Sequence, residues 1–428
     1  MRKNKFLLSL LLLATTATFA QTSKATVIKA GKILDVRTGK YLVGQRILVE
    51  DGIIKEVGPS VRIPSGAEQI DLSDATLLPG LIDCHTHISD EATGNYYDMF
   101  RKSTVDYAVV APIYCKQTLD AGFTTIRDLG SREFLDVALR NAINEGKIPG
   151  PRILAATYYI GATGSHGDVS GFSPWLSTKT PAEMSGVADG VEGVRQKVRY
   201  LVKNGADVIK FGASAGVLSE EESVGAPQYT QEEMNAIVAE ARMWGKRTAA
   251  HAHGAEAIKM AIRAGVSSVE HASLIDDEGI RLAMEHGTYL DMDVYNDDYI
   301  LSEYTKMNYP QKIIDKEKMV GLLQRQNFQK AVRAGAKMSF GTDAGVYPHG
   351  WNAKQFALMV KWGMTPLQAI QAATINASDL LGLGEKTGTL EPGKYADIIA
   401  VKGDPLNDVT VLEKGISFVM KAGEVYKK

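Results

Sequence analysis

Cysteine is scarce in this chain of 428 residues, which contains Cys84 and Cys115 and no other. Two thiols are too few for the disulfide framework that stabilises many small secreted domains, so the fold must depend on a packed core. Cys84 would need an activating partner beside it to act as a nucleophile. On a strand its neighbour His85 points to the opposite face, so we expect buried, unreactive thiols.

The chain also lacks an excess of charge and, beyond its first residues, a long apolar run. Its 48 lysines and arginines nearly balance 50 acidic residues, which leaves a formal net charge of -2. This balance gives no reason to expect nucleic acid or a membrane as a partner. With 45% hydrophobic residues, the chain can bury a large core in one large domain, with or without a second, smaller one.

The N-terminus has the anatomy of a secretory signal peptide over residues 1–20. A basic segment, Met1–Lys5, precedes an almost wholly apolar run from Phe6 to Leu13, and small residues lead up to Ala20. We expect cleavage near Ala20 and export of the mature protein to the periplasm or the exterior. No cysteine follows the apolar run, so a bacterial lipid anchor is not expected.

Both ends of the mature chain are typical of β-structure. Short runs with strand character occur at residues 25–34, 45–57, 396–401 and 416–420. The second run contains Asp51-Gly52, a strong hairpin-turn signal. We expect residues 21–76 and 385–428 to form a small β-sandwich together, beside the main domain.

Between residues 77 and 384, short β-rich runs alternate with amphipathic helical stretches. The predicted strands cover 77–87, 124–129, 151–157, 207–213, 247–253, 268–272, 288–293 and 337–343. The predicted helices cover 105–121, 134–145, 192–204, 231–244, 255–264 and 277–286, and glycine closes many of them. This alternation predicts an α/β fold, a (β/α)8 TIM-like barrel whose active site lies at the carboxyl ends of the strands.

His85-Thr86-His87, at the end of the first predicted strand, carries the most informative chemical signal. Side chains two apart on a strand share a face, so the two imidazoles can hold one cation together. A single pair of this kind is weak evidence, because polar residues commonly end a strand. Other strands end in the same way, with Lys210, His251, His253, His271 and Asp343.

Nitrogen and oxygen ligands at these strand ends suit zinc or a similar divalent ion. The set is His85, His87, Lys210, His251, His271 and Asp343. Lys210 fits if carbon dioxide has converted its amine to a carbamate, an anion able to bridge two metals. Considered alone, an ion pair between Lys210 and an acidic residue inside the barrel is the simpler interpretation. Within this set of ligands we favour the carbamate.

These motifs resemble those of the amidohydrolase superfamily, and more narrowly its Xaa-Pro dipeptidase-like branch, which includes ochratoxin-hydrolysing amidases. The resemblance extends over essentially the whole mature chain and rests on residues 79–87, 208–210, 250–254, 269–271, 341–343 and 392–399. It implies a buried ion held by His85, His87 and Asp343, a more exposed ion held by His251 and His271, and carboxylated Lys210 between them. It also implies a homo-oligomer.

A centre of this kind predicts a hydrolase. A water shared by two divalent ions loses a proton near neutral pH, which provides a hydroxide nucleophile. The hydroxide would attack an amide carbonyl polarised by the exposed metal. Asp343 would accept its proton and pass it to the leaving nitrogen, because an unprotonated amide nitrogen leaves poorly. We expect a small-molecule amide, such as a dipeptide or an N-acyl amino acid, as the substrate.

Four further residues are candidates for binding the substrate: His166, Tyr229, His253 and His349. The resemblance implies that His166 lies near the carbonyl or a substrate carboxylate, and that Tyr229 donates to the tetrahedral oxygen. A loop-stabilising His166 and an exposed loop Tyr229 are the simpler alternatives. His253 shares a face with His251 and could replace it as the ligand. The branch more commonly has glycine in place of Ser165, which leaves the shape of the pocket open.

Three other functions are compatible with the same fold. A lactonase or esterase would use the same hydroxide on an ester. A mononuclear deaminase usually carries a glutamate three residues after the fifth-strand histidine, a position that is Gly254 here. A non-catalytic binding protein on a retained barrel would have no need of the complete ligand set.

Overall fold

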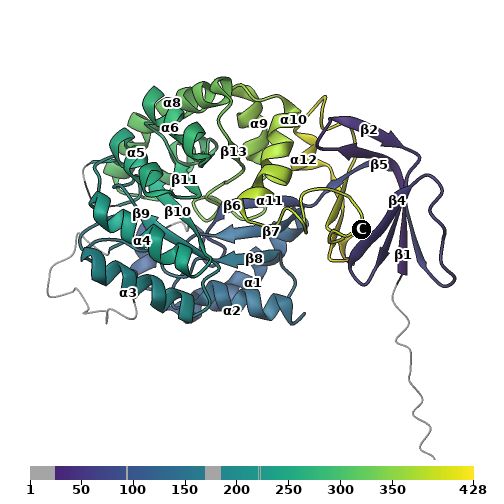
Figure 1. The fold of residues 1–428 in the computed structure, drawn as a ribbon, viewed down its shortest axis with the longest axis horizontal. Helices are drawn as coiled ribbons and strands as arrows, with labels where there is room; N and C mark the ends of the chain where they lie inside the picture. Colours follow the sequence, from purple (N-terminus) through teal and green to yellow (C-terminus); the bar gives the residue numbers. More distant parts are fainter. Residues whose placement is uncertain (1–24, 93–94, 169–184, 220, 222) are drawn as a thin grey trace, which may run out of the picture.

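A computed structural model describes residues 25–92, 95–168, 185–219, 221 and 223–428. The predicted signal peptide, residues 1–20, lies outside the described residues. Figure 1 shows two parts: a sheet of long strands at one end, and a larger domain in which helices surround parallel strands. Among the helices described, none combines the length and the apolar character that crossing a membrane requires.

Strands from both ends of the chain pair in one eight-stranded sheet, in the order β16-β15-β14-β5-β1-β3-β4, with β2 beside β1. Its strands are β1 (Ala25–Asp35), β2 (Lys40–Val43), β3 (Arg46–Glu50), β4 (Ile53–Gly58), β5 (Glu68–Pro79), β14 (Ile398–Val401), β15 (Ile416–Lys421) and β16 (Glu424–Lys427). The antiparallel pairing of β14 with β5 joins the two ends of the chain, as the sequence predicts. The pairing forms a continuous sheet, and its division into the two layers of a sandwich stays a prediction.

This sheet has an apolar core of its own. Ile28, Ile47, Leu77, Ile398 and Phe418 are buried and belong to one cluster. They come from β1, β3, β5, β14 and β15. Since a slip of one residue would turn these side chains to the other face, their burial holds the two ends of the chain in register.

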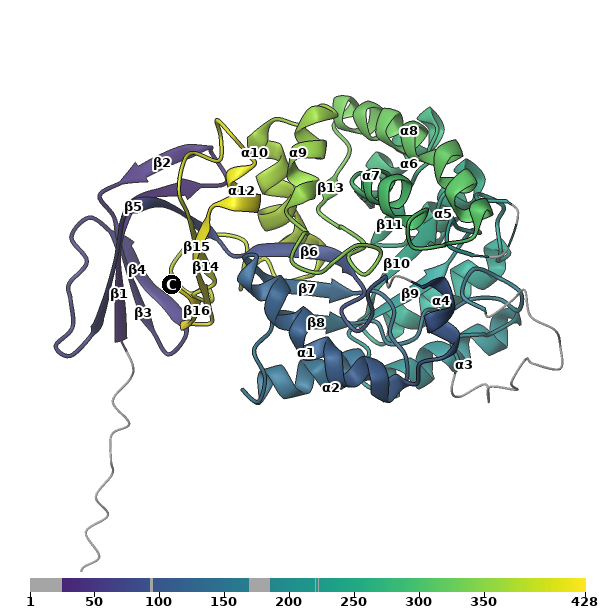
Figure 2. The same cartoon turned by 180° about the vertical axis from the view of Figure 1, so that it is seen from behind.

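Parallel strands form the centre of the larger domain, in ladders of three and five. The first contains β6 (Leu81–Thr86), β7 (Phe123–Asp128) and β8 (Arg152–Ala155), and the second contains β9 (Val208–Gly212), β10 (Arg247–Ala252), β11 (Ser268–His271), β12 (Tyr289–Asp291) and β13 (Met338–Ser339). Figure 2 shows the helices that follow these strands on the outside: α1 (Thr104–Asp120), α2 (Leu135–Asn144), α3 (Gly190–Lys203), α4 (Gln231–Met243), α5 (Ala255–Ala264) and α6 (Asp277–His286). Each strand and helix predicted for this region has a counterpart here.

Backbone hydrogen bonds join the edges of the two ladders. The N–H of Cys84 in β6 donates to the carbonyl of Phe340, just after β13, at 2.7 Å. On the other side, Ile160 donates to the carbonyl of Lys210 in β9 and accepts from the N–H of Gly212, both at 2.9 Å. Because the strands run parallel, their carboxyl ends meet at the same end of the domain. Residues at those ends therefore converge.

The junction between the two parts of the molecule lies at Gly80. The sequence predicts one strand over residues 77–87, and this prediction is wrong at its start, because residues 77–79 belong to β5 in the other sheet. A Cβ atom at position 80 would lie 2.2 Å from Oγ1 of Thr124. A side chain at this position would therefore block the close passage of the chain from one sheet to the next.

The hydrophobic pattern does not predict the helical segment between β12 and β13. This segment contains α7 (Asn296–Tyr299), the π-helical turn η3 (Ile300–Tyr304) and α8 (Gln311–Ala334). Polar residues occupy much of the buried face of α8, namely Lys316, Glu317, Gln324, Arg325 and Asn327. Met319, Leu322 and Leu323 are exposed instead. Because α8 buries polar residues and exposes apolar ones, its sequence lacks the regular spacing of apolar residues by which amphipathic helices are recognised.

Shorter helices complete the larger domain and lead the chain back to β14. They are η1 (Tyr96–Phe100), α9 (Lys354–Lys361), α10 (Pro366–Gln371), η4 (Ala372–Asn376) and α11 (Ala377–Leu380), with α12 (Val411–Lys414) between β14 and β15. η1 follows β6, so it lies at the carboxyl end of the strands and contributes Tyr96 to the cavity described next.

Candidate metal centre and substrate cavity

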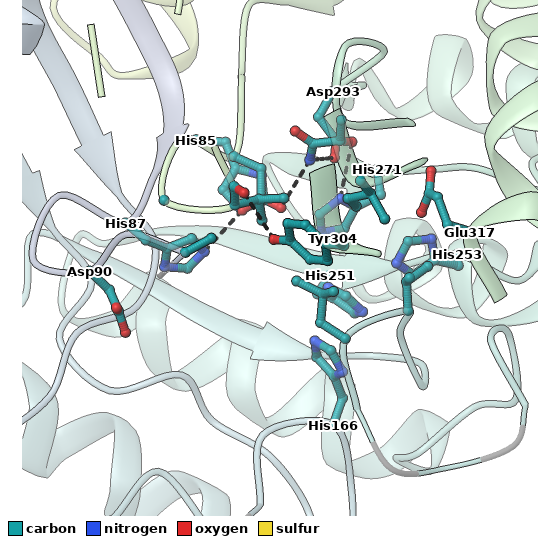
Figure 3. A pocket seen from close by; sticks show the side chains of 18 of the residues that line it. His85, His87, Asp90, His166, His251, His253, His271, Asp293, Tyr304 and Glu317 are labelled. Carbon is teal, nitrogen blue, oxygen red and sulfur yellow. Dashed lines mark hydrogen bonds and ion pairs between the residues drawn. The ribbon is translucent and has the colours of Figure 1, made fainter. Parts of the chain in front are cut away.

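The carboxyl ends of the parallel strands border a cavity of about 360 Å³, a size that suits a small molecule. All six predicted metal ligands line it: His85, His87, Lys210, His251, His271 and Asp343. Figure 3 shows the labelled histidines of β6, β10 and β11 extending into this space from different strands. The structure thus brings together the residues that the sequence selects at separate strand ends.

His85, His87 and Asp343 form the first group with ligand atoms close enough to share a metal. Oδ1 of Asp343 lies 3.3 Å from Nε2 of His85 and 3.1 Å from Nε2 of His87. Nδ1 of His87 lies 3.1 Å from the carbonyl of Gly130, which leaves Nε2 directed at the centre. Although burial opposes its charge, Asp343 raises the pKa of His87 to about 9. A metal ion at this point would replace that proton.

A charged network lies behind His85. Oε2 of Glu270 lies 3.4 Å from Nδ1 of His85. Arg127, fully buried, donates to both oxygens of Glu270 at 3.1 and 3.2 Å. Carboxylates behind metal-binding histidines fix the ring and its tautomer. Nδ1 of His85 faces this network without a hydrogen bond, and Nε2 faces Asp343 on the cavity side.

Two of the predicted ligands occupy unusual backbone conformations. Asp343 and His271 have φ values of 56° and 66°, in the left-handed region that residues other than glycine rarely adopt. Such conformations cost about 1–3 kcal/mol each and cluster at functional sites. Here the strained positions coincide with two residues whose side chains enter the cavity.

His251, His253 and His271 form a second group that can hold a metal ion. Nδ1 of His271 lies 3.0 Å from Oδ1 of Asp293, and Nδ1 of His253 lies 2.8 Å from Oγ of Ser273. Nε2 of His251 is buried and has no hydrogen-bond partner among the described residues. Burial lowers the pKa values of His251 and His253 well below their usual range, so both rings are neutral and suited to binding a cation.

Either His251 or His253 could complete the second group with His271, and a pair of variants separates them. We expect His251→Asn to lose metal, because Nε2 of His251 has no other partner. His253→Asn should retain two ions and chiefly raise KM, because His253 follows the end of β10 and lies farther toward the loop, where a substrate contact is easier. Elemental analysis of both purified variants is the measurement. Metal loss confined to His253→Asn would reverse the assignment.

Lys210 in β9 is fully buried and lines the same cavity. Burial lowers its pKa to about 8, although Glu270 and Asp343 favour the charged form. The neutral amine is the form that reacts with carbon dioxide to give a carbamate. Burial of Lys210 thus increases the fraction of neutral amine, which is the form that carboxylation requires.

A second layer of side chains holds Asp343 and Asp293 in place. Nδ2 of Asn296 donates to Oδ2 of Asp293 at 2.5 Å and to Oδ2 of Asp343 at 3.2 Å. Gln324, from α8, donates to Oδ1 of Asp293 at 2.9 Å. Asp293 ends a predicted strand and could have been found on that ground. Asn296 and Gln324 come from α7 and α8, for which the sequence offers no signal.

His166 is placed so that it could contact a molecule in the cavity. It lines the cavity, and its ring stacks on His251 with centroids 4.3 Å apart. Burial lowers the pKa of His166 to about 4, although Glu221 opposes the shift. The ring is therefore neutral, able to donate from one nitrogen and accept at the other.

Tyr229 and His349 are not among the described residues that line the cavity. The hydroxyl of Tyr229 donates to the carbonyl of Ala188 at 2.7 Å and is buried there. His349 lies outside the lining of the cavity. Its ring Nε2 is 2.8 Å from the carbonyl oxygen of Asp90, and its backbone N–H donates to the carboxylate of Glu91 at 2.9 Å. Direct substrate contact by Tyr229 or His349 has no support in this geometry, and we omit both from the proposed reaction.

Comparison with protein families gives one match, over residues 76–426, to the model described as the Amidohydrolase family. The chain is also 31% identical to an ochratoxinase of Aspergillus niger over 433 residues, an alignment that covers 95% of this chain and 87% of that protein.

Solved structures match over a similar extent. A Xaa-Pro dipeptidase with methionine bound in its active site has a TM-score of 0.90 and 38% identity, with 95% of this chain and 100% of that chain covered. A prolidase complexed with N-methylphosphonate-L-proline has a TM-score of 0.88 and 29% identity, with the same coverage of 95% and 100%. Sequence and structure therefore match the same group of proteins over nearly the whole chain.

Proposed function

The chain belongs to the amidohydrolase family, and from this premise we propose that it hydrolyses dipeptides or N-acyl amino acids at a centre of two divalent metal ions. The observation that carries the proposal is the convergence of six ligands on one cavity. Two solved relatives are, by their names, a dipeptidase and a prolidase, which supports peptide-like amides as substrates.

The donor groups fit two divalent ions such as zinc. His85, His87 and Asp343 would hold one, His251 and His271 the other, with carboxylated Lys210 between them. Imidazole nitrogen and carboxylate oxygen are the ligands that zinc favours. The buried Nε2 of His251 has no hydrogen-bond partner and supports this fit, because a bound metal ion would satisfy it. Bound divalent ions would supply an activated water and a Lewis acid for the carbonyl.

Asp343 is the proton carrier in the proposed reaction. Burial opposes ionisation, but the hydrogen bond and charge of His87 lower the pKa of Asp343 below its usual range. A metal ion in place of the His87 proton would supply positive charge at the same point, so the carboxylate would stay ionised and could accept a proton. It would then deliver that proton to the leaving nitrogen, which an amide requires. His166, neutral and in the cavity wall, would hydrogen-bond the substrate near the scissile bond.

Three further properties belong to the proposal. The two parallel ladders would form the (β/α)8 barrel predicted from the sequence, since backbone hydrogen bonds join their edges. Export would follow cleavage near Ala20, as the N-terminal pattern predicts. Self-association into a homo-oligomer stays an expectation from the family resemblance.

The proposed function is tested by a substrate panel on zinc-loaded protein. We expect turnover of at least some dipeptides or N-acyl amino acids, with activity abolished by a chelator and restored by the metal. Lactones and simple esters should be tested beside them, because the same nucleophile attacks esters. Efficient hydrolysis of esters or lactones, with no dipeptide or N-acyl amino acid cleaved, would establish the esterase alternative instead.

A further inference from the structure

Lys316, on the buried face of α8, holds the loop that follows β9. The residue is only 4% exposed. Its Nζ donates to the carbonyl oxygens of Gly216, Ser219 and Glu221 at 2.8, 2.7 and 3.0 Å. An ammonium group has three N–H donors, so these carbonyls engage all of them. Lys316 therefore fastens the loop to a helix that lies far from it in the sequence.

The ammonium group of Lys316 is present at neutral pH. Burial lowers the pKa of Lys316 to about 8, and Lys312 adds to this shift, while Glu221 opposes it. A group with this pKa is mostly protonated at neutral pH. The carbonyl of Gly216 also accepts from Oγ of Ser219 at 3.1 Å, but that bond stays within the loop. The hydrogen bonds of Lys316 are what tie this carbonyl to α8.

The backbone of Gly216 lies directly against two imidazole rings of the cavity. A Cβ atom at this position would lie 2.5 Å from Cε1 of His166 and 2.8 Å from Nε2 of His251, so a side chain does not fit here. The two rings stack on each other with centroids 4.3 Å apart, as Figure 3 shows. Any movement of Gly216 would therefore change the space around both rings.

The atom of His251 that faces Gly216 is the one expected to bind a metal ion. Nε2 of His251 is buried and has no hydrogen-bond partner among the described residues. On this side of the ring, the position of Nε2 thus depends on packing against its neighbours. The backbone of Gly216 is one of those neighbours, and Lys316 holds it in place.

His166 is connected to the same loop by hydrogen bonds. Its backbone N–H donates to Oε1 of Gln228 at 3.0 Å, and Nε2 of Gln228 donates to Oε1 of Glu221 at 3.1 Å. The carbonyl of Glu221 is one of those that accept from Lys316. A second route therefore leads from Lys316 to the His166 ring that stacks on His251.

The same helix also supports His271, the other ligand of this group. Gln324 donates to Oδ1 of Asp293 at 2.9 Å, and Asp293 contacts Nδ1 of His271 at 3.0 Å. Lys316 and Gln324 both belong to the buried face of α8 and lie about 12 Å apart along its axis. α8 thus reaches His251 and His271 through one intermediate residue each.

We propose that Lys316 is a positioning residue, which sets the binding site of the second metal ion by holding the backbone of Gly216 against His251 and His166. The inference rests on the proposed two-metal centre. Residues that support metal ligands typically contribute about 10–100-fold to metal affinity. The effect should be confined to one ion, because the contacts of Lys316 lead to the second group of ligands and not to the first.

Zinc titration against a competing chelator tests the inference. Lys316→Met keeps the length of the side chain but removes its donors, so we expect the affinity for one ion to fall by about 10–100-fold and the other to stay unchanged. Lys318→Met is the control, because Lys318 is exposed on the same helix and pairs with Asp315. Lys316→Gln keeps part of the hydrogen bonding and should fall between wild type and Lys316→Met. It decides the question if Lys316→Met does not fold. Unchanged affinities, or equal losses for both ions, would overturn the inference.

Histidine NMR of metal-free protein separates this inference from the proposed function. The ring signals of His251 and His166, labelled with ¹⁵N and assigned from their asparagine variants, should shift in Lys316→Met and Lys316→Gln. The signals of His85 should not move, and Lys318→Met should resemble wild type throughout. If wild type binds a single ion, the two-metal proposal fails, and these shifts still decide whether Lys316 positions the two rings. Unchanged His251 and His166 signals would show that it does not.

Discussion

Asp343→Asn should reduce turnover of amide substrates by roughly 10²–10⁴-fold, the usual contribution of a positioned proton carrier. Asparagine keeps the size of the side chain and one acceptor oxygen, but it cannot accept a proton as the carboxylate does. The left-handed backbone at this position, φ 56°, is tolerated by asparagine better than by most residues. The expected loss of amide turnover in Asp343→Asn would therefore reflect impaired proton transfer and not a disturbed fold.

Hydrolysis of an activated aryl ester should be slowed much less by Asp343→Asn. Its leaving group departs without a proton, so only the attack on the carbonyl still needs assistance. Both substrate types are measured in wild type and Asp343→Asn at equal metal loading, since Asp343 also contacts His85 and His87. Equal losses for amide and ester would show that Asp343 serves the metal rather than the leaving nitrogen.

Lys210→Ala should remove most of the metal and, with it, most of the activity. Mutating a residue that only hydrogen-bonds a metal ligand typically lowers metal affinity by about 10–100-fold. Loss of a ligand shared by two ions is expected to lower it more. Formate or acetate at high concentration should restore part of the metal content and part of the activity, because a small carboxylate can occupy the place of the carbamate.

Lys421→Ala is the matched control for Lys210→Ala. Lys421 is also buried, and burial likewise lowers its pKa to about 8, but its amine donates to the carbonyl of Gly150, away from the cavity lining. We expect this variant to keep its metal content. A Lys210→Ala protein that retains metal and full activity would exclude the carbamate.

The sequence was most informative where strand ends carry candidate metal ligands. Parallel strands must place their carboxyl ends together, so His85, His251 and Asp343 could be predicted to converge without knowing any loop. The same reasoning could have included Asp293, which ends a predicted strand and contacts His271. Regular alternation of strand and helix made this part of the fold predictable.

Residues on loops and on polar helix faces could not be placed in this way. Tyr229 lies in the loop after β9, and nothing in its sequence indicates that its hydroxyl meets the carbonyl of Ala188. Glu317 and Gln324 lie on α8, whose buried face is polar enough to hide the helix from a search for hydrophobic periodicity. The convergence of the candidate metal ligands was therefore predictable, whereas the substrate side of the cavity was not.

The most direct test of the account is the number of divalent ions bound per chain in active wild-type protein purified without chelator. The convergence of His85, His87, Asp343, Lys210, His251 and His271 predicts a value near two. The value should fall together with amidase activity as a chelator is added. A stable value near one in protein with full amidase activity would contradict a two-metal centre bridged by Lys210.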